Sequence, residues 1–237
     1  METNATVVVG IKQEQPSVLR FAMLAARAHR AALRVVHASG MPAEPAGPFQ
    51  GGQLVADLRT AGTAVLETAR HLVEQEDPGL SAEYVLRTAR TVDALEDEAR
   101  RASMLVVGID EISWPDRLLG GAVATHLALG AACPVVVVPE RISPTPLSGG
   151  VVVTVDGESG AEGALRFAFE HAAGTTRELH VMHAVPLGTA SPQLEAAKAT
   201  IGEVIAGWAS SYPDVHVSTS FAHDEPDDAC IRATERA

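Results

Sequence analysis

An internal repeat constrains this chain more than any other feature of its sequence. One copy begins at Val7 and reads VVVGIKQEQPSVLRFAMLAA, and the other begins at Val151 and reads VVVTVDGESGAEGALRFAFEHA. The valine runs lie 144 residues apart, whereas the LRFA segments at Leu19 and Leu165 lie 146 residues apart, so a two-residue insertion separates the matches. Matches in the same order at a nearly constant offset predict two copies of one structural unit.

The first copy alternates short apolar runs with segments of helical periodicity. A solid apolar run is typical of a strand that is buried on both faces of a parallel sheet, whereas apolar residues three or four apart indicate an amphipathic helix. We predict strands at 7–11, 33–38, 82–86, 104–107 and 135–138, and helices after the first strand, over 91–101 and near 121–131. A longer helix is expected on the apolar stripe Leu54, Leu58, Ala61, Val65, Ala69 and Leu72. This order predicts an α/β fold, a doubly wound five-stranded parallel sheet.

The repeat also predicts how the chain divides. Residues 1–140 are expected to form the first α/β domain, and the Pro, Ser and Gly content of residues 141–150 is typical of a linker. Residues 151–237 repeat only three strand–helix pairs, so we expect a second, truncated copy of the same fold. Such a copy is either part of a longer chain or a half domain that a neighbour completes.

The composition excludes several functional classes. A formal charge of −12, with only two lysines, argues against nucleic acid, because phosphate backbones need clustered Lys and Arg. The two cysteines, Cys133 and Cys230, show no metal-binding spacing and favour a reduced, cytoplasmic protein. No apolar run approaches the roughly 20 residues that span a bilayer, so no membrane partner is expected.

Two segments carry a family resemblance. VVVTVDGESGAEGALRFA, from residue 151, and LVVGIDEISWPDRLLGGAVATHLALGAACPVVVVP, residues 105–139, resemble universal stress proteins. The resemblance implies tandem doubly wound α/β domains that pair through their last strand. Many members of that family bind ATP, whereas others bind none and act by association.

The resemblance also supplies a pattern for the nucleotide site. Members that bind nucleotide are similar in having an Asp after the first strand and a G-x2-G-x9-G-[ST] pattern after the fourth. Gly108 and Gly121 match the first and third glycines. Glu111 replaces the second glycine, Ala122 replaces the Ser or Thr, and Lys12 replaces the Asp. The pattern is therefore degenerate in the first copy.

A carboxylate at Glu111 is the most consequential of these changes. Two unit charges 4 Å apart repel by ~1 kcal/mol in water and by ~4 kcal/mol at an effective dielectric constant of 20. Since each 1.4 kcal/mol changes affinity about tenfold, we expect the first-copy site not to function for ATP, unless Glu111 instead helps to hold a magnesium ion. The candidate, degenerate cofactor residues are Gly10, Ile11, Lys12, Ala38, Val107, Gly108, Glu111, Gly121, Ala122, Val123, Val155, Asp156 and Gly157.

The second copy keeps Val155, Asp156 and Gly157 but holds only half of such a site. Asp-Gly after a strand is also ordinary turn chemistry, and both interpretations stay open. No catalytic or metal-binding residues are predicted. His180 and His183 lie three apart on a strand, so they point to opposite faces and cannot share one ion.

The last strand of the first copy suggests how the protein associates. As an apolar strand at a sheet edge, it is expected to pair with another chain through Val135, Val136, Val137 and Val138. The resemblance implies a stress-response regulatory protein, and together with this edge strand it leads us to predict that the protein acts through association as a dimer. The alternative is an ATP-binding universal stress protein with weak or no hydrolysis.

Overall fold

The computed structural model describes residues 5–40, 51–109, 121–139, 149–156, 161–185 and 188–234. The chain forms two compact units, Met1–Pro144 and Thr145–Ala237, which are described separately.

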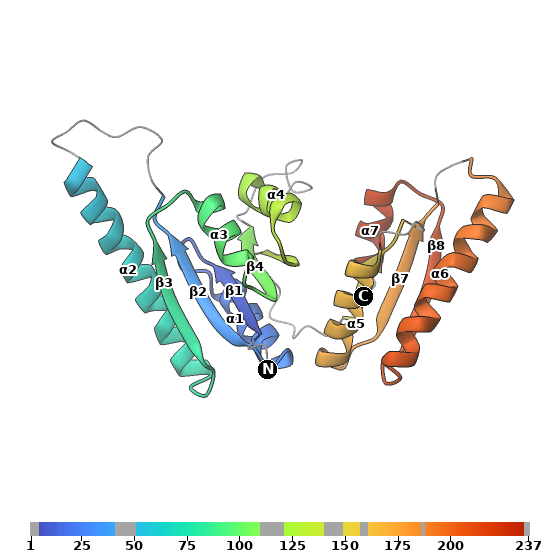
Figure 1. The fold of residues 1–237 in the computed structure, drawn as a ribbon, viewed down its shortest axis with the longest axis horizontal. Coiled ribbons are helices and arrows are strands. Elements are labelled where there is room, and N and C mark those ends of the chain that lie inside the picture. The colour runs from blue at the N-terminus through green and yellow to red at the C-terminus, as the bar shows by residue number, and fades with distance from the viewer. Residues whose placement is uncertain are drawn as a thin grey trace. The chain divides into compact units, whose positions relative to one another are not determined.

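The first unit is built on a five-stranded parallel sheet (Figure 1). Its strands are β1 (Thr6–Gly10), β2 (Ala32–Ala38), β3 (Ala82–Arg87), β4 (Met104–Ile109) and β5 (Val135–Pro139). They lie in the order β3-β2-β1-β4-β5, so β1 is central and β5 lies at an edge. Val9 pairs with Val35 on one side and with Val106 on the other. The predicted α/β fold with a five-stranded parallel sheet is confirmed.

Helices cover both faces of this sheet. They are α1 (Pro16–Ala28), α2 (Gly51–Glu76), α3 (Thr91–Ala99) and α4 (Gly121–Gly130). Figure 1 shows α1 and α2 on one face and α3 and α4 on the other. Val8 packs with Leu95 and Leu127 of α3 and α4, while Val7 and Val9 are buried on the opposite face because strand side chains alternate. Burial on both faces explains why these strands read as solid apolar runs.

The predicted long helix is α2, and the face that it turns to the sheet includes only part of the apolar stripe that predicted it. Its buried residues are Gly62, Leu66, Ala69 and Val73. Of the predicted stripe, Ala69 is buried, Leu58, Val65 and Leu72 are half-buried, and Leu54 and Ala61 are exposed. Two apolar rows run along this helix. The row with Gly62 packs closest to the sheet: a Cβ at position 62 would lie only 2.6 Å from Cδ1 of Leu86.

The second unit is a smaller parallel sheet with its own core. Its elements are β6 (Val151–Thr154), α5 (Glu162–Thr175), β7 (Leu179–Ala184), α6 (Ser191–Ser211), β8 (Val217–Ala222) and α7 (Pro226–Thr234). The strand order is β6-β7-β8. Phe169 is fully buried, and its ring centroid lies 6.0 Å from that of Trp208. Across both units, the helices that the structure describes lack the combination of length and apolar character that crossing a bilayer requires.

Candidate functional site

The candidate site lies where β1 and β4 end side by side. The strand order reverses between them, because β2 follows β1 along the chain but lies on its other side. Open parallel sheets bind ligands at this point, beyond the carboxyl ends of the strands. A cavity of about 290 Å³ opens there. It is lined by seven of the predicted residues, Gly10, Ile11, Lys12, Ala38, Val107, Gly108 and Val123, together with Gln15, Val36, Thr91 and Leu95.

Two glycines shape this crevice. A Cβ on Gly10 would lie 2.9 Å from both δ carbons of Leu95, so the glycine lets α3 pack against the end of β1. A Cβ on Gly108 would collide with the side-chain amide of Gln15 and would lie 2.9 Å from Cγ2 of Val18. Both glycines therefore allow close packing of protein side chains in the arrangement that the structure shows.

Gln15 is a crevice residue that the sequence analysis missed. Its Oε1 accepts a hydrogen bond from the backbone N–H of Lys12, with an N–O distance of 2.9 Å. The side chain therefore lies across the crevice, beside Gly108, where a ligand would approach the backbone. A single polar residue in a loop before a helix belongs to no periodic pattern, so nothing in the sequence marked it.

Two other predicted positions of the first unit, Gly121 and Ala122, open the helix that follows β4 along the chain. Gly121 and Ala122 are the first two residues of α4, and a helix N-terminus offers unpaired N–H donors. Glu111 lies outside the described residues. Lys12, which stands where the family pattern has an Asp, is exposed at the mouth of the cavity.

The crevice that the described residues form is small. Ligand pockets commonly measure about 300–1,000 Å³, so a cavity of about 290 Å³ lies at the lower limit. Gln15 lies across it, and a lysine cannot accept a hydrogen bond from a ribose hydroxyl. Apart from Gln15 and Lys12, the cavity lining is mostly aliphatic.

The strand end that carries Asp156 in the second unit is built in the same way as its counterpart in the first. Val155 is buried, and its N–H donates to the carbonyl of Met182 at 2.9 Å. Nδ1 of His183 lies 2.8 Å from the carbonyl oxygen of Val155. Asp156, the next residue, is exposed, and Gly157 lies outside the described residues. The geometry thus presents Asp156 at the carboxyl end of β6.

The two strand histidines of the second unit lie on opposite faces, as predicted. His180 lies between two hydroxyls, with Nδ1 2.8 Å from Oγ of Ser218 and Nε2 2.8 Å from Oγ of Ser220. His183 is buried against β6. Among the described residues, no group of three or more His, Cys, Asp or Glu side chains is placed to hold a metal ion.

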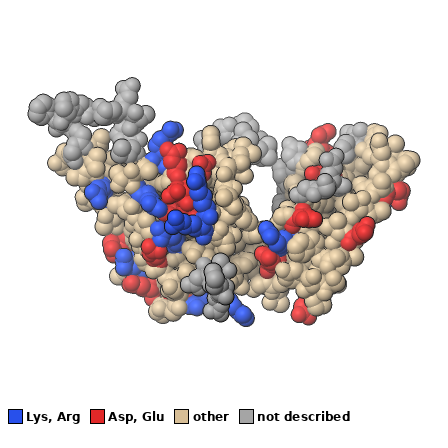
Figure 2. Space-filling view, in the orientation of Figure 1, with Lys and Arg blue, Asp and Glu red and all other residues tan. Residues whose placement is uncertain are grey.

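A charged network lies over β2, β3 and α3. The carboxylate of Glu98 accepts hydrogen bonds from Nε of Arg34 and from Nε of Arg87, each at 2.7 Å, and Arg34 also pairs with Glu83. Burial on its own would raise the pKa of Glu98, but the hydrogen bonds from the two guanidinium groups outweigh it and lower that pKa. On the face shown in Figure 2, basic and acidic side chains lie together rather than in a separate basic patch.

Comparison with known proteins identifies the family. The model of the universal stress protein family matches residues 3–139. A universal stress protein of Mycobacterium tuberculosis is 31% identical over 192 residues, which are 74% of this chain and 64% of that protein. The chain thus spans less than two thirds of the length of that relative.

A solved structure agrees on the fold. A universal stress protein from Archaeoglobus fulgidus superposes with a TM-score of 0.74 over 98% of this chain and 81% of that chain, at 17% identity. Another, from the same organism, was solved in complex with dAMP. It is 25% identical and covers 56% of this chain and 96% of that chain, with a TM-score of 0.42. From the family match and the identity to its relatives, the chain belongs to the universal stress protein family.

Proposed function

We propose that this chain is a stress-response regulatory protein that acts through association, with a degenerate nucleotide site in its first unit. The observation that carries the proposal is the position of Gln15, whose side chain lies across the crevice and is held there by the backbone of Lys12. A ligand that approached Gly108 would have to displace this side chain. The substitution of Asp by Lys12 removes an acceptor from the same place.

The edge strand β5 supports association. Its apolar residues lie at the border of the sheet, and the side chain of Val137 is 37% exposed. The neighbouring helix α4 also turns Leu129 outward, with 86% of that residue exposed. An apolar edge strand is a template for pairing with another chain. We infer that Val135, Val136, Val137 and Val138 pair with a second copy across a twofold axis.

The alternative function is ATP binding with weak or no hydrolysis. Its support is the crevice itself, since Gly10, Val107 and Gly108 meet at the point where open sheets bind ligands. In that alternative, Gln15 swings out of the crevice and Lys12 contacts phosphate.

Calorimetric titration with Mg-ATP separates the two functions. The unmodified chain would be compared with Gln15→Ala, Glu111→Gly and, as a control, Gln13→Ala, which changes a similar exposed side chain outside the crevice. We expect no binding by the unmodified chain and by Gln13→Ala. A gain of binding in Gln15→Ala or Glu111→Gly would identify the residue that closes the site. No binding by the unmodified chain or by any of the three variants would favour association alone. Micromolar binding by the unmodified chain would overturn the proposal in favour of the alternative.

A further inference from the structure

Helix α2 is much longer than the sheet that it covers. Its 26 residues extend over about 39 Å, whereas the six residues of β3 extend over about 20 Å. None of the described side chains from Gln53 to Ala61 is buried, although this part carries Leu54 and Leu58. The N-terminal half of α2 is therefore an amphipathic segment that the described chain covers only in part.

The outer row of α2 has the spacing of a helix–helix contact. Its members alternate at intervals of four and three residues and are Leu54, Leu58, Ala61, Val65, Thr68, Leu72 and Gln75. This is the a/d pattern by which one helix packs along another. We call this row the α2 seam.

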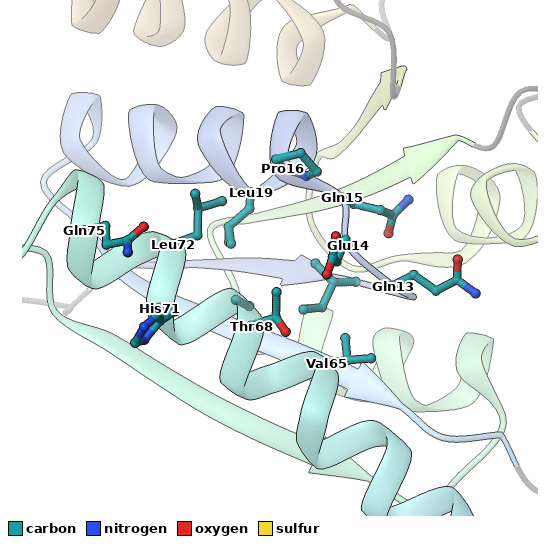
Figure 3. A pocket seen from close by; sticks show the side chains of 12 residues that line it. Gln13, Glu14, Gln15, Pro16, Leu19, Val65, Thr68, His71, Leu72 and Gln75 are labelled. Atoms are coloured by element: carbon teal, nitrogen blue, oxygen red, sulfur yellow. The ribbon is translucent and has the colours of Figure 1, made fainter.

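The C-terminal half of the α2 seam faces a groove between α1 and α2 (Figure 3). The groove measures about 290 Å³, and its apolar wall is formed by Ile11, Leu19, Val65, Ala69 and Leu72. In Figure 3, Leu19 and Leu72 lie side by side where the two helices are close, and the helices diverge from there toward Val65. Arg20 of α1 is hydrogen-bonded to the last residue of α2, with its Nε 2.9 Å from Oε1 of Glu76. The groove therefore widens toward the part of α2 that is only partly covered.

We propose that the occupant of this groove is α2 of a second copy of the chain, in antiparallel orientation. The register that places seam residues opposite one another sets Leu54 against the partner's Leu72, Leu58 against the partner's Thr68 and Ala61 against the partner's Val65. The protruding half of each helix then fills the groove of the other copy. One contact covers both of the apolar surfaces that the described residues leave open.

The pairing of polar side chains favours the antiparallel orientation over the parallel one. Asp57 and His71 flank the α2 seam on the same side, one at each end, and both are exposed. In the antiparallel register, Asp57 lies beside the partner's His71, so a carboxylate faces an imidazole at both ends of the contact. In a parallel pair, the flanking residue beside Asp57 would be the partner's Gly62, which has no side chain to pair with the carboxylate.

This surface is separate from the strand edge in the proposed function. Helix α2 packs on β2 and β3, at the opposite border of the sheet from β5. The helix contact does not depend on the strand contact, and a chain that uses both would form assemblies larger than a dimer.

Sedimentation equilibrium tests the contact with a matched pair of variants. Both are made in a Val137→Lys background, which weakens the strand contact so that the helix contact is measured alone. Leu58→Glu places a charge in the α2 seam, and Thr60→Glu places the same charge two residues away on an exposed position outside it. Because each substitution acts twice in a symmetric pair, we expect Leu58→Glu to raise the dimer Kd at least about tenfold and Thr60→Glu to change it less than about twofold. Equal dimer Kd values for the two variants would overturn the proposal.

Two further measurements test the register. Asp57→His and His71→Asp should each weaken the dimer, and the double variant should restore it. After both native cysteines are replaced by serine, oxidation of a mixture of Leu54→Cys and Leu72→Cys should link the two variants, whereas Leu54→Cys alone should remain unlinked. Efficient linkage of Leu54→Cys to itself would contradict the antiparallel arrangement, and these results do not depend on nucleotide binding.

Discussion

Nδ1 of His183 lies 2.8 Å from the carbonyl oxygen of Val155, which is the last residue before Asp156. The first unit repeats this contact, with Nδ1 of His37 2.9 Å from the carbonyl oxygen of Ile11. In both units, the N–H of the same strand-end residue also donates to the neighbouring strand. In each unit, the histidine therefore fixes the backbone just after the first strand, which is β1 in the first unit and β6 in the second.

Replacement of His183 should destabilise the second unit. In His183→Ala, the buried carbonyl of Val155 loses a partner and a ring that is 8% exposed leaves a cavity, so we expect a loss of about 1–3 kcal/mol. Urea unfolding measures the loss. His180→Ala is the control, because His180 bonds to surface hydroxyls, and its cost should stay below about 1 kcal/mol. An equal cost for the two variants would mean that the strand-end contact is not what stabilises the unit.

Glu98 should be a stabilising residue of the first unit. Glu98→Gln removes the charge that binds Arg34 and Arg87, and we expect a loss of about 1.5–3 kcal/mol at pH 7, the range for hydrogen bonds to charged groups. Asp97→Asn is the control, since Asp97 is exposed and lies 3.7 Å from Arg87. It should change the unfolding free energy by less than about 0.5 kcal/mol.

The effect of Glu98→Gln should depend on pH in a defined direction. The pKa of Glu98 is lowered in the folded protein. Its stabilisation is therefore fully present above the unfolded-state pKa of about 4.3 and is lost as the pH falls through the folded-state value. We expect the difference in unfolding free energy between the unmodified chain and the variant to shrink between neutral and acidic pH. A difference that stays constant down to about pH 3 would contradict this assignment.

Two glycine substitutions should change the free energy of unfolding in opposite directions. In Gly62→Ala, the new Cβ would lie 2.6 Å from Cδ1 of Leu86 and 2.8 Å from Cδ2 of His37, so α2 or these side chains must shift and we expect a loss of about 1–3 kcal/mol. Gly202 lies within α6, and a Cβ there would meet no atom within 4 Å. Gly202→Ala should therefore stabilise the second unit by about 0.5–1 kcal/mol. Thermal unfolding checks both signs, and a neutral Gly62→Ala would show that α2 does not pack as closely as described.

A lysine on the edge strand should weaken self-association. Val137→Lys places like charges together if two β5 strands pair across a twofold axis. In a Leu58→Glu background, which removes the helix contact, light scattering should show a dimer, and the further substitution Val137→Lys should convert it to a monomer. Val204→Lys is the control, because Val204 is similarly exposed, at 36%, but belongs to the second unit. A monomeric Leu58→Glu chain at micromolar concentration would count against strand pairing.

Much of the first unit could be predicted from its pattern. The apolar runs at Val7 and Met104 marked strands because each is buried on both faces, and that burial leaves no polar residue to interrupt the run. His37 and His183 lie 146 residues apart, the same offset as the LRFA segments, although only the structure shows the carbonyl oxygens that they contact.

Other features could not be predicted from the sequence. On α2, the rows that contain Val65 and Leu66 are both apolar, and periodicity alone does not say which of them faces the sheet. The close approach of Gly62 to Leu86, which is distant in sequence, determines which row faces the sheet. The position of Gln15 depends on its local bond to Lys12, which leaves no repeating signal.

The central position of β1 has a consequence for synthesis. This strand is made first, but its second neighbour, β4, begins only at Met104. Since synthesis adds about 5–20 residues per second, one edge of β1 stays unpaired for on the order of ten seconds until that neighbour is made. Chains arrested at Ser103 should bind a hydrophobic dye more strongly than chains arrested after Pro139, and equal binding would contradict this order. We therefore expect any need of the first unit for chaperones to be greatest before its fourth strand emerges.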